Sequence, residues 1–278
     1  MKKDIQKKRA EDLLALHHDP SILVLPNIWD PLGALMLQQL GYPAVATASA
    51  SVAYSLGFDD GQNISLETML AAIERIVERV DIPVSADMER GYGESPEEVA
   101  QNMRRVIEAG AVGINIEDST AEGGPLFPES FQCDRIAAVR AMANEAGIHL
   151  VINARTDVFI GGIAGSAETR LAEAIHRGES YMAAGADCFY PILAGDVPML
   201  TSIYEALRCP INVLALADTA PMEELEAIGM ARLSLGPGLI KASLTSMRQI
   251  AANLRDYGNY DQFTSEAMSG DEMQTYLK

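Results

Sequence analysis

The chain has 278 residues, of which 48% are hydrophobic, and its formal net charge is −18. This length fits one large domain, such as a single α/β barrel, or two ordinary ones, and the hydrophobic content is enough for a sizeable core. The acidic excess argues against binding to nucleic acid or to an anionic membrane. The three cysteines form no CxxC pair, so neither a zinc site nor a disulfide framework is predicted.

No apolar run approaches the roughly 20 residues that a membrane-spanning helix needs. The basic N-terminus, residues 1–8, is followed by charged residues where a signal peptide needs an apolar stretch. We therefore expect a cytoplasmic protein.

In chain order, eight short apolar segments alternate with amphipathic helical patterns. Strands are predicted at 22–28, 44–49, 83–88, 112–118, 149–156, 188–193, 211–215 and 232–236. Helical patterns between them include 66–80, 96–109, 134–146 and 167–184. Several helical stretches end in glycine directly before a strand, which is typical of a short loop that leads into a buried parallel strand. Ser95-Pro96-Glu97-Glu98 marks a helix start, with a serine N-cap, proline at the first position and acids in the first turn.

Eight strand–helix units without a linker between them predict a closed (β/α)8 barrel. The barrel forms one domain over residues 1–278, with a core at about 22–255, an N-terminal helix and a C-terminal helical tail at 256–278. A doubly wound sheet is the alternative, because periodicity alone does not show that the sheet closes.

Polar side chains gather where three consecutive predicted strands end. Asp87 and Glu89 alternate at the first of these ends, and Glu117 and Arg155 follow at the next two. Barrel enzymes build their active sites at this end of the barrel. Buried carboxylates without partners would repel one another strongly, and a hard divalent cation such as Mg²⁺ removes that repulsion. The sequence therefore predicts a carboxylate-held metal, with Arg155 as a planar fork for a substrate carboxylate.

The simpler alternative is that these acids only form ion pairs with Arg90 and Arg155.

The segment Thr47-Ala48-Ser49 ends the second strand with small residues, so its backbone N–H groups can approach a ligand oxygen.

Histidine and lysine are too scarce at strand ends to support other chemistry. No Ser-His-Asp or Cys-His arrangement can be assembled there, which disfavours hydrolase-type nucleophilic catalysis. A Schiff base would rest on Lys241 alone. What remains is metal polarisation of a 2-oxo acid with a charge-stabilised enolate.

Together these residues resemble the isocitrate lyase/phosphoenolpyruvate mutase superfamily over residues 25–244. The segments that carry the resemblance are Leu25-Pro26-Asn27-Ile28-Trp29-Asp30, Thr47-Ala48-Ser49, Asp60, Asp87 with Glu89, Ile116-Glu117-Asp118, Asn153-Ala154-Arg155-Thr156-Asp157 and Ser234-Leu235-Gly236-Pro237.

The resemblance implies a role for each matching position. Asp87 and Glu89 would approach the metal, with Asp60 and Glu117 in its water-mediated shell. The metal would be Mg²⁺, with Mn²⁺ as the alternative. Thr47, Ala48 and Ser49 would hold the pyruvyl or enolate oxygens. Arg155 would bind the substrate carboxylate.

Two further sets of residues complete the expected site. Arg155, Glu117 and Asp60 are the expected catalytic residues, and Asn212 is an additional substrate-binding residue on the seventh strand. Cys133 is expected just before the helix at 134–146, where packing is its commoner role.

The chain departs from the superfamily's pattern at three positions. Glu89 stands where an aspartate is usual. The loop at 119–128 has no lysine, cysteine or histidine, whereas isocitrate and methylisocitrate lyases carry Lys-Lys/Arg-Cys-Gly-His there. Ile192 follows Pro191 where methylisocitrate lyases tend to have a glutamate.

The leading hypothesis is a Mg²⁺-dependent lyase that cleaves a C–C bond next to a small 2-oxo or 2-hydroxy carboxylate. The alternatives are oxaloacetate decarboxylation, a P–C bond reaction of the phosphonopyruvate or carboxyphosphonoenolpyruvate type, and a non-catalytic barrel that binds a 2-oxo acid. The superfamily implies a homodimer or homotetramer, and the tail could pack on a neighbouring subunit.

Overall fold

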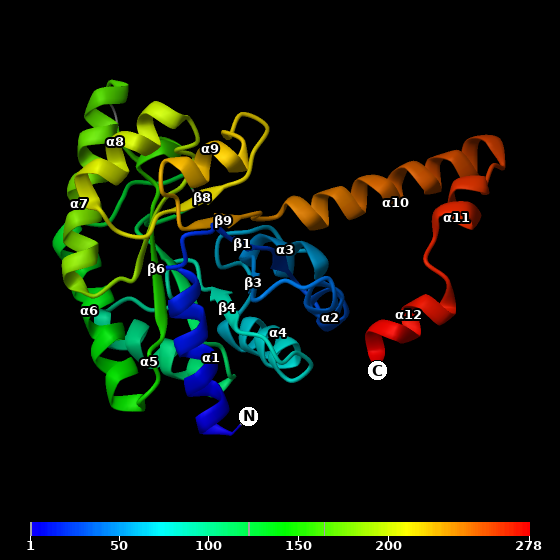
Figure 1. The fold of residues 1–278 in the computed structure, drawn as a ribbon, viewed down its shortest axis with the longest axis horizontal. Helices are drawn as coiled ribbons and strands as arrows, with labels where there is room; N and C mark the ends of the chain where they lie inside the picture. Colours follow the sequence, from blue (N-terminus) through cyan, green and yellow to red (C-terminus); the bar gives the residue numbers. More distant parts are fainter. Residues whose placement is uncertain (1, 122, 164) are drawn as a thin grey trace.

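The computed structural model describes residues 2–121, 123–163 and 165–278, and it has parallel strands at the centre of its body with helices around them (Figure 1). All eight predicted strands are confirmed, the first of them in two pieces. They are β1 (Leu23–Leu25), β2 (Asn27–Ile28), β3 (Val45–Thr47), β4 (Val84–Asp87), β5 (Gly113–Glu117), β6 (Val151–Thr156), β7 (Cys188–Pro191), β8 (Asn212–Leu214) and β9 (Arg232–Ser234).

Two sheets together form a ring of parallel strands. Strands β2 to β7 pair in chain order, and β1, β9 and β8 form a second sheet. Pro26 separates β1 from β2 because it has no N–H to donate, although its carbonyl still accepts from Ala46 N at 2.9 Å. Between β7 and β8 the pairing is reduced to a single bridge, Phe189 with Ile211. The fold is the (β/α)8 barrel that the sequence predicts.

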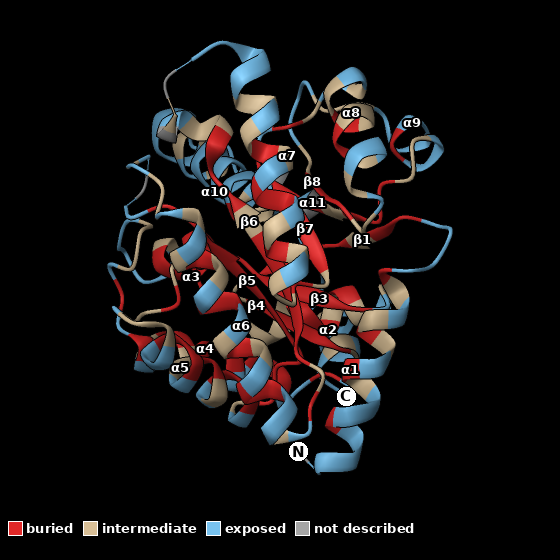
Figure 2. Cartoon of the chain, turned by 90° about the vertical axis from the view of Figure 1, so that its left-hand side faces the viewer, coloured by how far each residue is buried: buried red, intermediate tan, exposed pale blue. Residues whose placement is uncertain are grey.

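The helices cover the outside of the ring. They are α2 (Pro31–Gln39), α3 (Ser49–Ser55), α4 (Leu66–Val77), α5 (Pro96–Glu108), α6 (Glu129–Ala146), α7 (Ala167–Ala184), α8 (Val197–Leu207) and α9 (Met222–Ala227), with a π-helical turn at Val158–Gly162. Figure 2 shows their exposed outer faces around a buried set of strands. No helix in the described ranges is long and apolar enough to cross a membrane.

Helix α6 begins five residues earlier than the sequence predicts, at Glu129 rather than at 134. Pro128 has the N-cap position, and an acidic residue in the first turn favours the helix dipole. Cys133 therefore lies inside the helix and not before it. Cys133 is half-buried, and burial raises the pKa of its thiol, so the structure gives it no sign of reactivity.

The N-terminal helix α1 (Lys3–Leu16) closes the end of the barrel where the strands begin. Gln6 Nε2 donates to the carbonyls of Ile107 and Ala111, at 2.6 and 3.2 Å, just before β5 starts. Leu13 is fully buried and leaves no room for a side chain at Gly113. The opposite end, where the strands finish, is the one left for a ligand.

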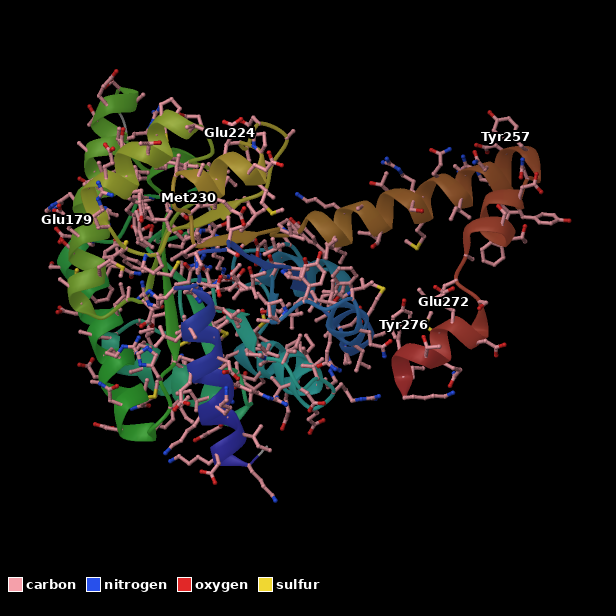
Figure 3. The ribbon with its side chains drawn as sticks, viewed as in Figure 1. Glu179, Glu224, Met230, Tyr257, Glu272 and Tyr276 are labelled. Atoms are coloured by element: carbon pink, nitrogen blue, oxygen red, sulfur yellow. The ribbon has the colours of Figure 1, made fainter. Side chains whose placement is uncertain are left out.

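The C-terminal segment forms an arm. Helix α10 (Gly238–Tyr257) projects from the body of the molecule, and α11 (Asp261–Glu266) reverses the chain (Figure 1). Helix α12 (Gly270–Leu277) returns toward α2, where Gln39 Nε2 donates to the Thr275 carbonyl at 2.9 Å. Figure 3 shows Tyr257 at the far end of this arm and Tyr276 on the returning helix.

Candidate active site

A small cavity lies at the carboxyl ends of the strands. Its volume is about 80 Å³, and every strand from β2 to β9 contributes to its lining. Of the predicted residues, Thr47, Ala48, Ser49, Asp60, Asp87 and Arg155 line it. A cavity of this size holds only a small ligand, because one water already needs about 10–15 Å³ on the same measure.

Asp87 is the centre of the polar contacts on this side. Its Oδ2 accepts from Ser49 N at 3.0 Å and from Ser49 Oγ at 2.8 Å, and its Oδ1 accepts from Asn115 Nδ2 at 2.8 Å. Thr47 Oγ1 accepts the Asp87 N–H at 2.9 Å. The turn at Thr47–Ser49, expected to hold substrate oxygens, thus also positions the Asp87 carboxylate, and the Ser49 N–H is directed to it.

Glu89 leaves the strand geometry that the alternating pattern assumes. Its φ is +50°, a left-handed conformation that is uncommon for a side chain of this size. Its carboxylate accepts from Gln62 N at 2.5 Å and from Tyr92 OH at 2.9 Å. Burial, and then the charges of Asp87 and Asp60, raise the pKa of Glu89 to about 7.

Asp60 completes a group of three acids. Burial and the charge of Asp87 raise its pKa, and its Oδ1 is buried without a hydrogen-bond partner among the described residues. Among the residues that the structure describes, no three acidic, histidine or cysteine side chains converge closely enough to bind one ion directly. Mutually repelling carboxylates and an unpartnered oxygen nevertheless fit a hard divalent cation that keeps part of its water shell.

Glu117, predicted to lie in the water-mediated shell of the metal, contacts two arginines. Its Oε2 lies 3.0 Å from Arg155 Nη1, and its Oε1 lies 3.8 Å from Arg90 Nη1. Burial raises the pKa of the Glu117 carboxyl, and the Arg155 charge opposes that rise. For Glu117 the geometry is that of the simpler ion-pair alternative. Asp87 and Glu89 form no such pair in the described part of the chain.

Arg155 is fixed from two sides. Besides Glu117, it donates from Nε to Asp157 Oδ1 at 2.5 Å and from Nη2 to Asp157 Oδ2 at 3.1 Å. One N–H on each Nη nitrogen remains for a ligand, since a guanidinium has five donors. Arg155 is therefore a pre-oriented fork at the cavity wall.

Asp118 is a positioning residue that the sequence reasoning did not single out. It is fully buried and accepts from Asp157 N at 2.9 Å, from Thr156 Oγ1 at 2.7 Å and from Tyr181 OH at 2.7 Å. These bonds fix the backbone that carries Asp157, and through it Arg155. The segment Ile116-Glu117-Asp118 was its only sequence signal.

Two cavity residues, Tyr190 and Arg232, were also missed. Tyr190 pairs in register with Arg155, and Arg232 pairs with Asn212, so each shares an inward face with a predicted residue. Asn212 itself does not line the cavity. It is fully buried, and its Oδ1 accepts from Ser234 Oγ at 3.0 Å.

The barrel with acids and arginines at its strand ends defines a class of enzymes, the lyases and mutases of the isocitrate lyase/phosphoenolpyruvate mutase superfamily. Comparisons with known proteins agree with this assignment. The family model described as phosphoenolpyruvate phosphomutase matches residues 13–255. The chain belongs to this family, as its sequence motifs predict.

Three relatives illustrate the range of the family. A solved structure of a "putative lyase/mutase" from Burkholderia cenocepacia J2315 superposes with a TM-score of 0.91, at 33% identity over 99% of this chain and 97% of the other. The 2-methylisocitrate lyase of Escherichia coli strain K12 is 31% identical over 64% of this chain and 60% of its own length. The oxaloacetate decarboxylase of Rhodopseudomonas palustris strain BisA53 is 30% identical over 66% and 63%.

Proposed function

We propose that the protein is a divalent-metal-dependent lyase that cleaves a C–C bond next to a small 2-oxo or 2-hydroxy carboxylate, through an enolate. The observation that carries this proposal is the group Asp60, Asp87 and Glu89. Asp60 and Asp87 are half-buried and line a cavity that Arg155 also lines, and Glu89 is buried near enough for their charges to raise its pKa. Such a group is costly to bury unless a cation or a charged ligand compensates it.

The roles of the individual side chains follow from their contacts. Asp87 would hold the cation, Mg²⁺ or Mn²⁺, with Asp60 and Glu89 acting through its water shell. When bound, the cation supplies Lewis-acid stabilisation of negative charge on the substrate. The two remaining Nη hydrogens of Arg155 bind the substrate carboxylate, and Glu117 and Asp157 keep that guanidinium in place.

Tyr190 contributes a hydroxyl beside the cavity. Burial raises its pKa, so it stays protonated and can donate a hydrogen bond to a substrate oxygen. Thr47 and Ser49 act mainly by orienting Asp87, while the backbone of the same turn also borders the cavity.

Oxaloacetate decarboxylation is the second candidate. The loop at 119–128 has no lysine, cysteine or histidine, and decarboxylation to an enolate needs no protein acid there. The relationship to the R. palustris oxaloacetate decarboxylase also supports it.

A substrate screen tests the proposal. Purified protein is assayed with Mg²⁺ and with EDTA on 2-methylisocitrate, isocitrate, oxaloacetate, malate derivatives and phosphonopyruvate. We expect metal-dependent C–C cleavage of at least one of the carboxylic acids other than phosphonopyruvate. The variant Asp87→Ala should lose at least about 100-fold in kcat, as removal of an essential electrostatic group does, with the fold retained by circular dichroism.

Asp59→Ala is the matched control, because Asp59 is the exposed neighbour of Asp60 and its loss should leave turnover unchanged. Activity on phosphonopyruvate alone would show a P–C enzyme. No turnover on any compound, with a 2-oxo acid still bound, would show a binding barrel. Either result overturns the lyase proposal.

We also propose that the protein works as a homodimer or homotetramer paired through α10. One side of this helix carries a stripe of apolar residues spaced by three and four, at Ile240, Leu244, Met247, Ala251 and Leu254, the spacing of helices that pair. Met247 and Leu254 are 60% and 51% exposed. An apolar cavity of about 450 Å³ between α2, α12 and the start of α10 offers a further contact surface.

A further inference from the structure

Arg232 is a buried cation without a counter-ion. It is only 3% exposed, and in the described part of the chain no carboxylate lies within ion-pair distance of it. Burial lowers its pKa, and the charges of Cys188, Tyr190 and Asp87, in that order, oppose the fall. Two nearby arginines differ: half-buried Arg155 and buried Arg177 each contact two acids. Arg135 is also buried without an acid partner among the described residues, but it donates to the Arg90 carbonyl and to Gln132 Oε1, and it does not line the cavity.

A relay of hydrogen bonds aims this guanidinium. Arg232 Nε donates to Ser234 Oγ at 3.1 Å, and Ser234 Oγ donates to Asn212 Oδ1 at 3.0 Å. The relay fixes one side of the group and leaves Arg232 Nη1 buried with no hydrogen-bond partner. An unsatisfied buried donor of a charged group is costly, and native proteins keep few of them.

The same residue faces the active-site cavity. Arg232 and Ser234 line it from β9, whereas Arg155 lines it from β6, with Tyr190 of β7 also in the wall. A ligand in the cavity would meet two guanidinium groups contributed by different strands. Asn212 does not line the cavity, so it acts on Arg232 through Ser234 as a positioning residue.

We propose that Arg232 binds a second anionic group of the substrate, so that the substrate carries a carboxylate or phosphonate at the end remote from Arg155. This inference rests on the proposed function for the location of the substrate, and it narrows the substrate class to acids that carry at least two anionic groups. A neutral or monoanionic 2-oxo acid would leave the buried guanidinium uncompensated.

Binding of non-reacting ligands tests the subsite independently of turnover. Acetate, malonate, succinate and phosphonoacetate are titrated calorimetrically, with Mg²⁺, into the parent protein and into Arg232→Gln. We expect the parent to bind at least one dianion more tightly than acetate. In Arg232→Gln the affinity for that dianion should fall about 10- to 100-fold, as expected for loss of a charge-assisted hydrogen bond, and that for acetate by less than about threefold.

Two further measurements separate binding from a structural role. Arg232→Lys keeps the charge and should retain part of the dianion preference. The melting temperature of ligand-free Arg232→Gln should equal or exceed that of the parent, because an unpaired buried charge has been removed. Preference for malonate or succinate would assign a carboxylate, and preference for phosphonoacetate would assign a phosphonate.

The inference is overturned if the parent does not prefer any dianion over acetate. It is also overturned if Arg232→Gln weakens acetate and dianion equally, or if it loses stability along with all binding. Failure of the substrate screen leaves these titrations unaffected, so the two proposals fail separately.

Discussion

Burial keeps the imidazole of His17 neutral. The side chain is 2% exposed, its Nδ1 lies 2.8 Å from the Leu13 carbonyl, and its Nε2 has no partner among the described residues. Burial, followed by the charge of Arg232, lowers the pKa of His17 to about 4. The unfolded chain, with a histidine pKa near 6.5, binds a proton between these two values that the folded chain does not bind.

We therefore expect the stability contributed by neutral His17 to be complete above pH 6.5 and to be lost as pH falls toward 4. The loss is up to about 3 kcal/mol on linkage arithmetic. Urea unfolding of the parent and of His17→Gln at several pH values measures it, since the variant cannot titrate. The exposed His18→Gln is the control. The same pH dependence in parent and His17→Gln would contradict the assignment.

Single residues of the site could be predicted as far as strand alternation holds. Asp87, Glu117 and Arg155 were found because each lies at the inward end of a strand, and all three lie around the site. The partners of Glu89 could not be predicted, because its left-handed φ takes the chain out of the alternating pattern. Arg232 begins its strand, where a polar residue is expected to lie far from the site, and the length of its side chain carries the guanidinium to the cavity.

At the scale of elements, helix starts depend on local capping. Ser95 is the N-cap of α5, and its Oγ accepts from Glu98 N at 3.2 Å. Ser95→Ala should lower the free energy of unfolding by about 1 kcal/mol, because a backbone N–H of the first turn loses its acceptor. Denaturant unfolding measures the change.

Ser130→Ala is the matched control, because Ser130 is exposed in the first turn of α6 and does not cap it. Its effect should stay within about 0.5 kcal/mol. Equal losses for the two variants would show that the Ser95 cap contributes nothing specific.

Elements were predictable in kind and order, and less so at their boundaries. The apolar run at 22–28 gave one strand, but Pro26 divides its hydrogen bonds between two sheets. The sequence predicts the start of α6 too late, because the apolar pattern before 134 is weak, whereas Pro128 and Glu129 set the start in the structure. Such differences depend on single residues, a strand-interrupting proline or a helix cap, that a repeating pattern does not register.

At the scale of the whole molecule, α10 is the element whose surroundings are incomplete. A 20-residue helix with an exposed apolar stripe is rare in a monomer. We expect the parent to have twice or four times the chain mass of 29.9 kDa by light scattering. The double substitution Met247→Asp and Leu254→Asp should reduce this to the monomer mass, because two charges would be buried in the interface.

Gln249→Asp is the matched control, since Gln249 lies on the opposite side of α10 and is exposed. Its mass should equal that of the parent. A parent that is already monomeric, or a double variant with unchanged mass, would show that the stripe does not pair the chains.

The thin pairing between β7 and β8 has a consequence for every experiment on this cavity. Backbone bonds hold most of the barrel wall, but at this position a single bridge joins the strands that carry the cavity residues Tyr190 and Leu214. Side-chain packing on both faces of these strands must supply the cohesion that the missing ladder does not, from the cavity residues and from the fully buried Phe189 and Val213 that alternate with them. Cavity residues on these two strands therefore also help to hold the barrel wall together. A substitution at one of them is expected to change the shape of the cavity as well as its contacts with a ligand.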